Sequence, residues 1–261
     1  MALLFKHKPG LVAYVTCGDP AIAATKDIVL AAAGAGADVI ELGVPFSDPV
    51  ADGPVIQRAS ERALRQGTKL QNVLDVAREV RRESEVGLIV FSYLNPLLKF
   101  GLERFCKAAQ EAGVDGALVT DLPVEEAGEY LAFMRKHKLA TIFLAAPTST
   151  DERLKKIAKA STGFVYAVSR TGVTGARQEL SADAHELATR LRRFTKLPIA
   201  VGFGIATAEQ VRAVGEFADA AVVGSALMQA IEKTPVSAAQ AVAQLVNNLR
   251  STERVSSGFG K

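Results

Sequence analysis

Short apolar runs recur along the chain at fairly even intervals, and the stretches between them have the spacing of amphipathic helices. Each run is continuous instead of alternating and is rich in Val, Ile and aromatic residues. Such runs are expected for strands buried on both faces of a parallel sheet. The eight runs are LVAYVT from Leu11, DVIELG from Asp38, GLIVFSY from Gly87, GALVTD from Gly116, ATIFLA from Ala140, GFVYAVS from Gly163, LPIAVGFG from Leu197 and DAAVVGS from Asp219.

The stretches between the runs predict helices. One of them has a single apolar stripe beside a charged face: Leu70, Val73, Leu74, Ala77 and Val80. Three helices are expected to begin with a capping box: Thr68 with Gln71, Ser149 with Glu152, and Thr207 with Gln210. Eight strand–helix units without a break in composition predict an α/β protein with a single (β/α)8 TIM barrel. The barrel is expected to span residues 1–250, and residues 251–261 are expected to form a polar, disordered tail.

The interval between the second and third runs is longer than the others. It has room for an extra helix at about residues 55–66, which Gly67 would end. Pro54 suits the first position of that helix, because the N–H that proline lacks would have no partner there. The stretch ELGVPFSDPVADGP, residues 41–54, is therefore expected to be an enlarged loop after the second strand. In barrels such loops build the active site.

The amino-acid composition and the net charge limit the kinds of function that this chain can have. The chain has 261 residues, 49% of them hydrophobic, and a net charge of +3 without a dense basic run. This charge does not predict nucleic-acid binding, whereas a small anionic substrate would suit it. Cys17 and Cys106 have no paired spacing and are expected to be free, buried thiols. We find no secretory signal and no run of membrane-spanning length, so a soluble, cytoplasmic protein is expected.

The residues at the carboxyl ends of the predicted strands are the candidates for chemistry. No histidine is among them, since His7, His137 and His185 fall elsewhere. No lysine is among them either, since Lys196 precedes the seventh strand and Lys99 lies well past the third. This argues against a Ser-His-Asp triad, a histidine-based metal site and Schiff-base chemistry. Proton transfer is therefore expected to depend on carboxylates, with Tyr93 and Tyr166 as helpers.

Three carboxylates follow the second strand closely. Glu41 ends the strand, where desolvation should raise its pKa and suit it to acid–base catalysis. The alternative is a structural glutamate that bonds to barrel side chains or a loop amide. Asp52 precedes the extra helix and is either functional or the N-cap of that helix. Asp48 is the weakest candidate, because an Asp-Pro pair commonly starts a turn.

The last two units suggest a phosphate site. Phe203 and Gly204 follow the seventh strand, and Gly224 with Ser225 opens the eighth helix, where backbone N–H groups can bind an anion. Simple turns would explain either set of glycines alone. The long polar segment 169–184 after the sixth strand is expected to be either a lid or a disordered surface loop.

Six segments, in order over nearly the whole chain, resemble the tryptophan synthase alpha chain family. They are VTCGDP from Val15, ELGVPFSDPVADGP from Glu41, DLPVEE from Asp121, SRTGVTGA from Ser169, VGFGI from Val201 and VVGSA from Val222. The resemblance implies a lyase that cleaves indole-3-glycerol phosphate to indole and glyceraldehyde 3-phosphate by a retro-aldol reaction. It implies that Glu41 is the general acid and base, and that Asp52 holds the indole N–H and stabilises positive charge on the ring.

The resemblance also assigns binding residues and a partner. Tyr14, Phe91 and Leu118 would line the indole pocket, Tyr166 would lie near the substrate, and Thr174 would join the catalytic aspartate when the lid closes. Phosphate would bind at Gly175, Phe203, Gly204, Gly224 and Ser225. No metal and no cofactor is expected in this chain. The expected partner is a beta chain that carries pyridoxal phosphate, in a complex of two alpha and two beta chains, and the loop at residues 45–52 would face it.

Three other functions remain open on the sequence alone. Glu41, Asp48 and Asp52 could be oxygen ligands of a metal-dependent aldolase or enolising enzyme. The chain could be an inactive regulatory subunit, although its predicted catalytic pair is intact. It could also be a free-standing lyase that releases indole.

Overall fold

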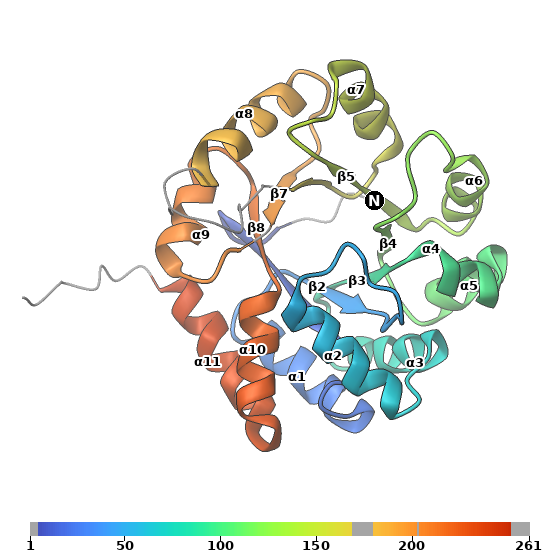
Figure 1. Ribbon diagram of the computed structural model, residues 1–261, viewed down its shortest axis with the longest axis vertical. Coiled ribbons are helices and arrows are strands. Elements are labelled where there is room, and N and C mark those ends of the chain that lie inside the picture. The colour runs from blue at the N-terminus through green and yellow to red at the C-terminus, as the bar shows by residue number, and fades with distance from the viewer. Residues whose placement is uncertain (1–4, 169–179, 203, 252–261) are drawn as a thin grey trace, which may run out of the picture.

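The chain folds as a closed barrel of eight parallel strands, whose order around the barrel follows their order in the sequence (Figure 1). The computed structural model describes residues 5–168, 180–202 and 204–251. The strands are β1 (Gly10–Thr16), β2 (Val39–Gly43), β3 (Gly87–Ser92), β4 (Gly116–Val119), β5 (Ala140–Ala145), β6 (Val165–Val168), β7 (Ile199–Gly202) and β8 (Ala220–Val223). Each lies within or next to one of the eight apolar runs. The TIM barrel predicted from the sequence is confirmed.

Helices surround the barrel on the outside (Figure 1). They are α1 (Ile22–Gly34), α2 (Pro54–Arg65), α3 (Leu70–Arg81), α4 (Leu94–Phe100), α5 (Leu102–Glu111), α6 (Gly128–Lys136), α7 (Asp151–Ala160), α8 (Leu180–Arg192), α9 (Ala208–Gly215), α10 (Ser225–Lys233) and α11 (Ala238–Arg250), with a 3₁₀ turn η1 (Pro235–Ser237) before the last. The extra helix predicted after the second strand is α2. Pro54 is its first residue, and Gly67 follows its end with a φ of +77°.

The apolar core has two parts, one between the strands and the helices and one inside the barrel. Strand residues that are neighbours in register share a face of the sheet, so the barrel interior can be followed from strand to strand. The interior cluster comprises Val12, Val39, Ile89, Leu118, Ile142, Phe164, Tyr166, Ala200, Ala220 and Val222. It fills the barrel, so any substrate must bind at one end and not in a pore.

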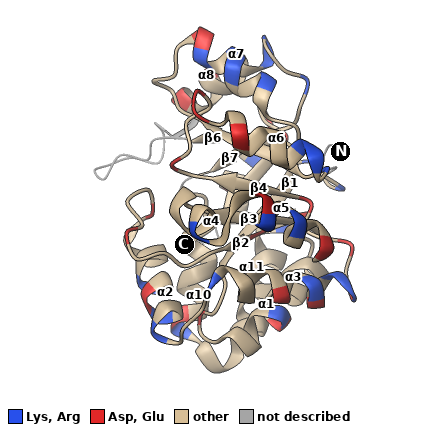
Figure 2. Ribbon diagram, turned by 90° about the vertical axis from the view of Figure 1, so that its right-hand side faces the viewer, with Lys and Arg blue, Asp and Glu red and all other residues tan. Residues whose placement is uncertain are grey.

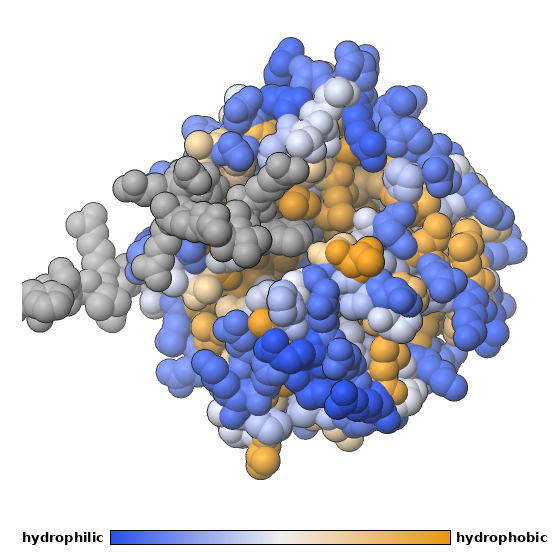
Figure 3. Space-filling model, viewed as in Figure 1, coloured by the Kyte–Doolittle hydropathy of each residue, from blue (hydrophilic) through white to orange (hydrophobic). Residues whose placement is uncertain are grey.

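Charged residues are concentrated on the outer helices and loops, while the strands between them are mostly uncharged (Figure 2). On the face shown in Figure 3, apolar residues border the centre, and the surrounding helices present mostly hydrophilic side chains. The solvated helix faces expected from the sequence are therefore present. Within the described ranges, no helix is both long and apolar enough to span a bilayer.

Of the three predicted capping boxes, one is confirmed. Thr207 caps α9 by accepting the Gln210 N–H at 3.3 Å, and the Gln210 side chain bonds back. The prediction at Thr68 is wrong, because α3 begins one residue later and the Lys69 N–H donates to the Asn72 side chain at 2.9 Å. Thr68 is instead buried beside the backbone of Gly18.

The prediction at Ser149 is also wrong by one residue. Thr150 caps α7 by accepting the Arg153 N–H at 3.3 Å. The hydroxyl of Ser149 accepts the Ala146 N–H at 3.2 Å instead. Two adjacent hydroxyls can each cap a helix, and the turn that Ser149 closes decides between them.

Candidate active site

Glu41 lies on β2 and points into the end of the barrel. In register it is opposite Tyr14 on β1 and Ile89 on β3, and Ile89 belongs to the interior cluster. Only 1% of Glu41 is exposed. Its Oε1 atom is buried and has no hydrogen-bond partner among the described residues. Burial raises the pKa of Glu41 to about 8.

These surroundings bear on the two roles considered for Glu41. A structural glutamate would use its oxygens to bond barrel side chains or loop amides, and the described part of the chain supplies no such bond to Oε1. A buried carboxyl with a raised pKa can hold a proton near neutral pH and release it to a substrate. The environment of Glu41 therefore favours proton transfer.

Asp52 lies in the enlarged loop, two residues before α2. The N-cap of α2 is Gly53, and no side chain caps this helix, so the alternative role of Asp52 as a helix cap is excluded. Its backbone is held in place, because the Asp52 N–H donates to the Pro49 carbonyl at 3.0 Å and the Gln57 side chain donates to the Asp52 carbonyl at 2.9 Å. Burial raises the pKa of the carboxyl to about 6, and a hydrogen bond from Tyr93 lowers it in part.

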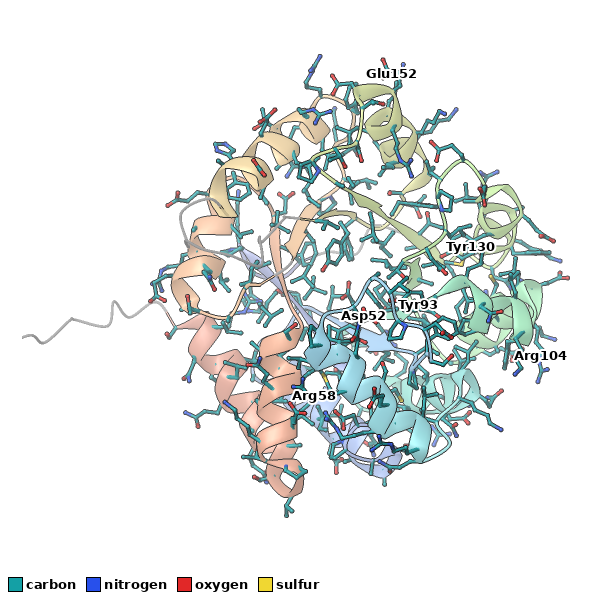
Figure 4. All side chains as sticks on the ribbon, in the orientation of Figure 1. Asp52, Arg58, Tyr93, Arg104, Tyr130 and Glu152 are labelled. Atoms are coloured by element: carbon teal, nitrogen blue, oxygen red, sulfur yellow. The ribbon has the colours of Figure 1, made fainter. Side chains whose placement is uncertain are left out.

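Tyr93 holds the loop that carries Asp52. Its hydroxyl accepts the Ala51 N–H at 2.9 Å and donates to the Asp52 carboxylate. The ring packs against Phe46, with 5.1 Å between ring centroids, and Tyr93 is 2% exposed. Asp52 and Tyr93 lie next to each other at the inner edge of the barrel (Figure 4). The strand-end position indicated a helper residue, but the hydrogen bond to residues 51 and 52 has no signal in the sequence.

Asp48 does not join the other two carboxylates. It is exposed, and its carboxylate accepts the Ser47 hydroxyl at 2.6 Å within the same turn. It lines an outer groove of about 280 Å³ between the loop and α2: Phe46, Ser47, Asp48, Pro49, Val50, Gln57, Glu61 and Leu64. Among the residues that the structure describes, no three His, Cys, Asp or Glu side chains gather as metal ligands would. The three carboxylates therefore do not form a common ligand set.

Aromatic side chains surround the two remaining carboxyls. The rings of Tyr14 and Phe91 meet edge to face, with 5.1 Å between centroids. Burial raises the pKa of Tyr14 and of Tyr166 well above the usual value, and the charges of Glu41 and Asp52 raise both further. Both phenols therefore stay protonated, and Tyr14 is the register neighbour of Glu41.

Two glycines make room for these phenols. A Cβ atom on Gly43 would collide with the hydroxyl of Tyr14, and a Cβ atom on Gly202 would collide with that of Tyr166. Leu118, on β4, belongs to the interior cluster, and Phe91 on β3 packs against it and is opposite Leu118 in register. Leu118 and Phe91, two of the residues that the family resemblance assigns to an indole pocket, thus lie at the barrel interior. The third, Tyr14, is the register neighbour of Glu41.

The predicted anion site is only partly described. Gly224 is the N-cap of α10 without a side-chain cap, and the exposed Ser225 is the first residue of this helix. Free N–H groups and the helix dipole at such an end favour an anion. Gly204, exposed after β7, has a φ of +79°, which favours glycine. Thr174, Gly175 and Phe203 lie outside the described residues, and so does the predicted lid as far as residue 179. The prediction of a lid or loop is wrong for residues 180–184, which form the first turn of α8.

A comparison with protein families identifies the chain. The model of one family, "Tryptophan synthase alpha chain", matches residues 1–257. The chain belongs to the tryptophan synthase alpha chain family. The resemblance found in the six sequence segments is confirmed, and the protein is a lyase that cleaves indole-3-glycerol phosphate in tryptophan biosynthesis.

Tryptophan synthase alpha chains of other organisms are similar in sequence to this chain over most of its length. The tryptophan synthase alpha chain of Solibacter usitatus is 53% identical over 255 residues, which cover 98% of this chain and 94% of the relative. That of Cupriavidus metallidurans is 50% identical over 238 residues, which cover 90% and 89%.

Solved structures have the same fold. A chain from the tryptophan synthase α2β2 complex of Pyrococcus furiosus has a TM-score of 0.89 at 41% identity, with 94% of this chain and 99% of that chain covered. A tryptophan synthase of Mycobacterium tuberculosis has a TM-score of 0.85 at 35% identity, with coverage of 93% and 91%.

Proposed function

We propose that Glu41 and Asp52 divide the work of the tryptophan synthase alpha chain reaction between them. The observation that carries this proposal is the state of Glu41, a buried carboxyl with an unpartnered oxygen and a pKa raised to about 8. Such a group is protonated near neutral pH and can act first as an acid. Asp52, with a pKa raised only to about 6, is mostly ionised at the same pH. Near neutral pH, Glu41 is thus mostly uncharged and Asp52 mostly negative.

We propose that the reaction proceeds by proton transfer from and back to Glu41. Glu41 donates its proton to the indole ring carbon that bears the glycerol chain, and the ring becomes positively charged. The Asp52 carboxylate accepts a hydrogen bond from the indole N–H and stabilises this charge. The bond between the ring and the glycerol chain then breaks, its electrons return to the ring, and the Glu41 carboxylate takes the hydroxyl proton. The products are indole and glyceraldehyde 3-phosphate.

The other residues bind the two ends of the substrate. Tyr14, Phe91, Leu118 and Tyr166 provide apolar surface for the indole ring. Gly204, Gly224 and Ser225 provide backbone N–H groups for the phosphate. The additional phosphate contacts of Gly175 and Phe203, and the closure of a lid that brings Thr174 to Asp52, are predictions from the family resemblance.

We also propose that the chain works with a beta chain, as in the α2β2 complex of Pyrococcus furiosus. The loop at residues 45–52 offers a surface for this partner, because Val50 is 86% exposed there and borders the outer groove. Pyridoxal phosphate would belong to the beta chain, and no step in this chain depends on a cofactor. A cytoplasmic location is part of the same proposal.

The test is a steady-state assay of indole formation from indole-3-glycerol phosphate, with and without a beta chain. We expect Glu41→Gln to lower turnover at least about a hundredfold, the scale of a lost general acid. Glu85→Gln is the matched control, because that side chain is 89% exposed. Near-normal turnover of Glu41→Gln would refute the assignment.

The same assay separates the alternatives. A large increase on adding the beta chain would support the coupled enzyme, and equal rates would support a free-standing lyase. No indole under either condition would support an inactive regulatory subunit. Loss of activity after exhaustive chelation would support metal-dependent chemistry.

A further inference from the structure

A network of charged side chains joins three elements of the barrel. Arg62, on α2, donates through Nε and Nη2 to the two carboxylate oxygens of Asp19, at 2.8 Å each. Through Nη1 it donates to Glu232 on α10, at 2.7 Å. Arg58, one turn earlier on α2, donates to both oxygens of Glu232, at 2.9 and 2.8 Å. Figure 4 shows Arg58 where α2 and α10 meet.

Burial distinguishes this network from ordinary surface ion pairs. The Asp19 side chain is 1% exposed, and that of Arg62 is 29% exposed. A carboxylate that is buried to this degree needs a partner, and the two-pronged contact with a guanidinium fixes the relative orientation of both groups. Gln66, just after α2, adds a bond to the Pro20 carbonyl at 2.5 Å. The last turn of α2 is thus attached to the loop after β1 at two places, through Arg62 and through Gln66.

Each of the three elements also carries, or directly follows, a residue of the proposed site. Asp19 follows β1, which holds Tyr14. α2 begins at Pro54, two residues after Asp52. α10 begins at Ser225, next to Gly224. α2 contacts both β1 and α10, so a shift of α2 would move Asp52 relative to the aromatic pocket and the anion site.

We propose that Arg62 is a positioning residue for the lyase reaction. By holding α2 against Asp19 and Glu232, it sets the place of Asp52 relative to Tyr14 and to the N-terminus of α10. Among the described residues, the hydrogen bonds of the Arg62 side chain go to Asp19 and Glu232, neither of which belongs to the proposed substrate site. This inference rests on the proposed function, and it adds to it a residue that acts through the placement of Asp52.

Two variants separate positioning from folding. Arg62→Lys keeps the positive charge but loses the fork that binds both oxygens of Asp19. The double variant Asp19→Asn/Arg62→Gln removes both charges together, so that no buried charge is left without a partner. Arg65→Lys and Arg65→Gln are matched controls on the same helix, because the Arg65 side chain is 77% exposed.

The experiment measures kcat and KM for indole-3-glycerol phosphate on the full chain, alone or with a beta chain, whichever gives measurable turnover. The inhibition constant of inorganic phosphate and the urea midpoint are measured beside them. We expect both Arg62 variants to lose about tenfold to a hundredfold in kcat, the scale of a catalytic group misplaced by about 1 Å. Phosphate inhibition should not change, because the anion site belongs to β7, β8 and α10. The Arg65 variants should match the wild type.

Unchanged kcat in both Arg62 variants would overturn the inference. So would a loss of kcat that is matched by the loss of folded protein or of phosphate inhibition, since a purely structural role predicts parallel losses. Failure of the proposed function is a different outcome, because it would appear as an inactive wild-type chain.

Discussion

Glu41 on β2 and Asp52 in the loop that follows are both carboxyls, but their neighbours differ, in keeping with the different roles proposed for them. Desolvation acts on both. Within the part of the chain that the structure describes, a hydrogen-bond donor that favours the ionised form, Tyr93, acts on Asp52 and none acts on Glu41. Pairs of carboxyls that are separated in this way commonly divide acid and base work in enzymes. The position of Glu41 at a strand end could be predicted from the sequence. The donor for Asp52 could not, since Tyr93 and Asp52 are far apart along the chain.

The separated pKa values predict a bell-shaped pH dependence of kcat/KM. Activity should fall as the pH drops through about 6, because Asp52 then gains a proton and can no longer stabilise a positive ring. It should also fall as the pH rises through about 8, because Glu41 then lacks the proton that it must donate. Initial rates at low substrate between pH 5 and 9 measure both limbs, whose midpoints belong to the coupled pair. A profile that is flat between pH 7 and 9 would contradict the assignment of Glu41 as the acid.

Tyr93→Phe tests the hydrogen bond that holds Asp52. The variant should lose about tenfold in kcat, because a hydrogen bond to a charged group is worth about 1.5–3 kcal/mol. The acidic limb should move to higher pH, because the bond from Tyr93 lowers the pKa of Asp52. The measurement is the same pH series of initial rates.

Tyr130→Phe is the control for that experiment. Tyr130 is also buried, but its hydroxyl donates to the Ala117 carbonyl at 3.1 Å, between α6 and β4. This variant should lose some stability and keep the pH profile of the wild type. An unshifted acidic limb in Tyr93→Phe would show that the phenol does not act on Asp52.

At the scale of elements, the strands were easier to predict than the starts of the helices. A strand buried on both faces is marked by its own composition, and all eight apolar runs became strands. A capping residue is chosen among neighbouring hydroxyls by contacts elsewhere in the fold, such as the turn that Ser149 closes. This explains the error at Ser149, where the neighbouring hydroxyl of Thr150 caps the helix. At Thr68 the N-cap is Lys69, which has no hydroxyl, and the prediction at Thr207 was right.

Thr207→Ala should destabilise the protein by about 1 kcal/mol, the usual cost of a lost N-cap. The reason is that the Gln210 N–H, which now donates to the threonine hydroxyl at 3.3 Å, would lose that partner within the helix. Thr207→Ser keeps the hydroxyl and should be close to the wild type. Urea unfolding of the three proteins measures the difference, and equal midpoints would mean that water replaces the cap.

At the scale of the whole molecule, the barrel must hold together its first strand and its last helix. Arg250, the last residue of α11, donates to the Gly36 carbonyl at 2.9 and 2.7 Å and to the Pro9 carbonyl at 2.6 Å, and it pairs with Asp38. The Asp38 side chain is fully buried and also accepts the Leu11 N–H at 2.8 Å. The cluster lies just before β1 and β2 begin, at the end of the barrel opposite Glu41.

Arg250→Met should therefore reduce stability without changing the chemistry. It leaves Asp38 buried without its guanidinium partner, and breaking a buried pair from one side costs about 3–5 kcal/mol. Urea unfolding measures this loss, and Arg135→Met is a control at an exposed position near the end of α6. Turnover per folded molecule should stay at the wild-type value, because the cluster is at the other end of the strands from the two carboxyls. A loss of turnover in folded Arg250→Met would show that the two ends of the barrel are coupled, and it would contradict the separation of a stabilising end from a catalytic end.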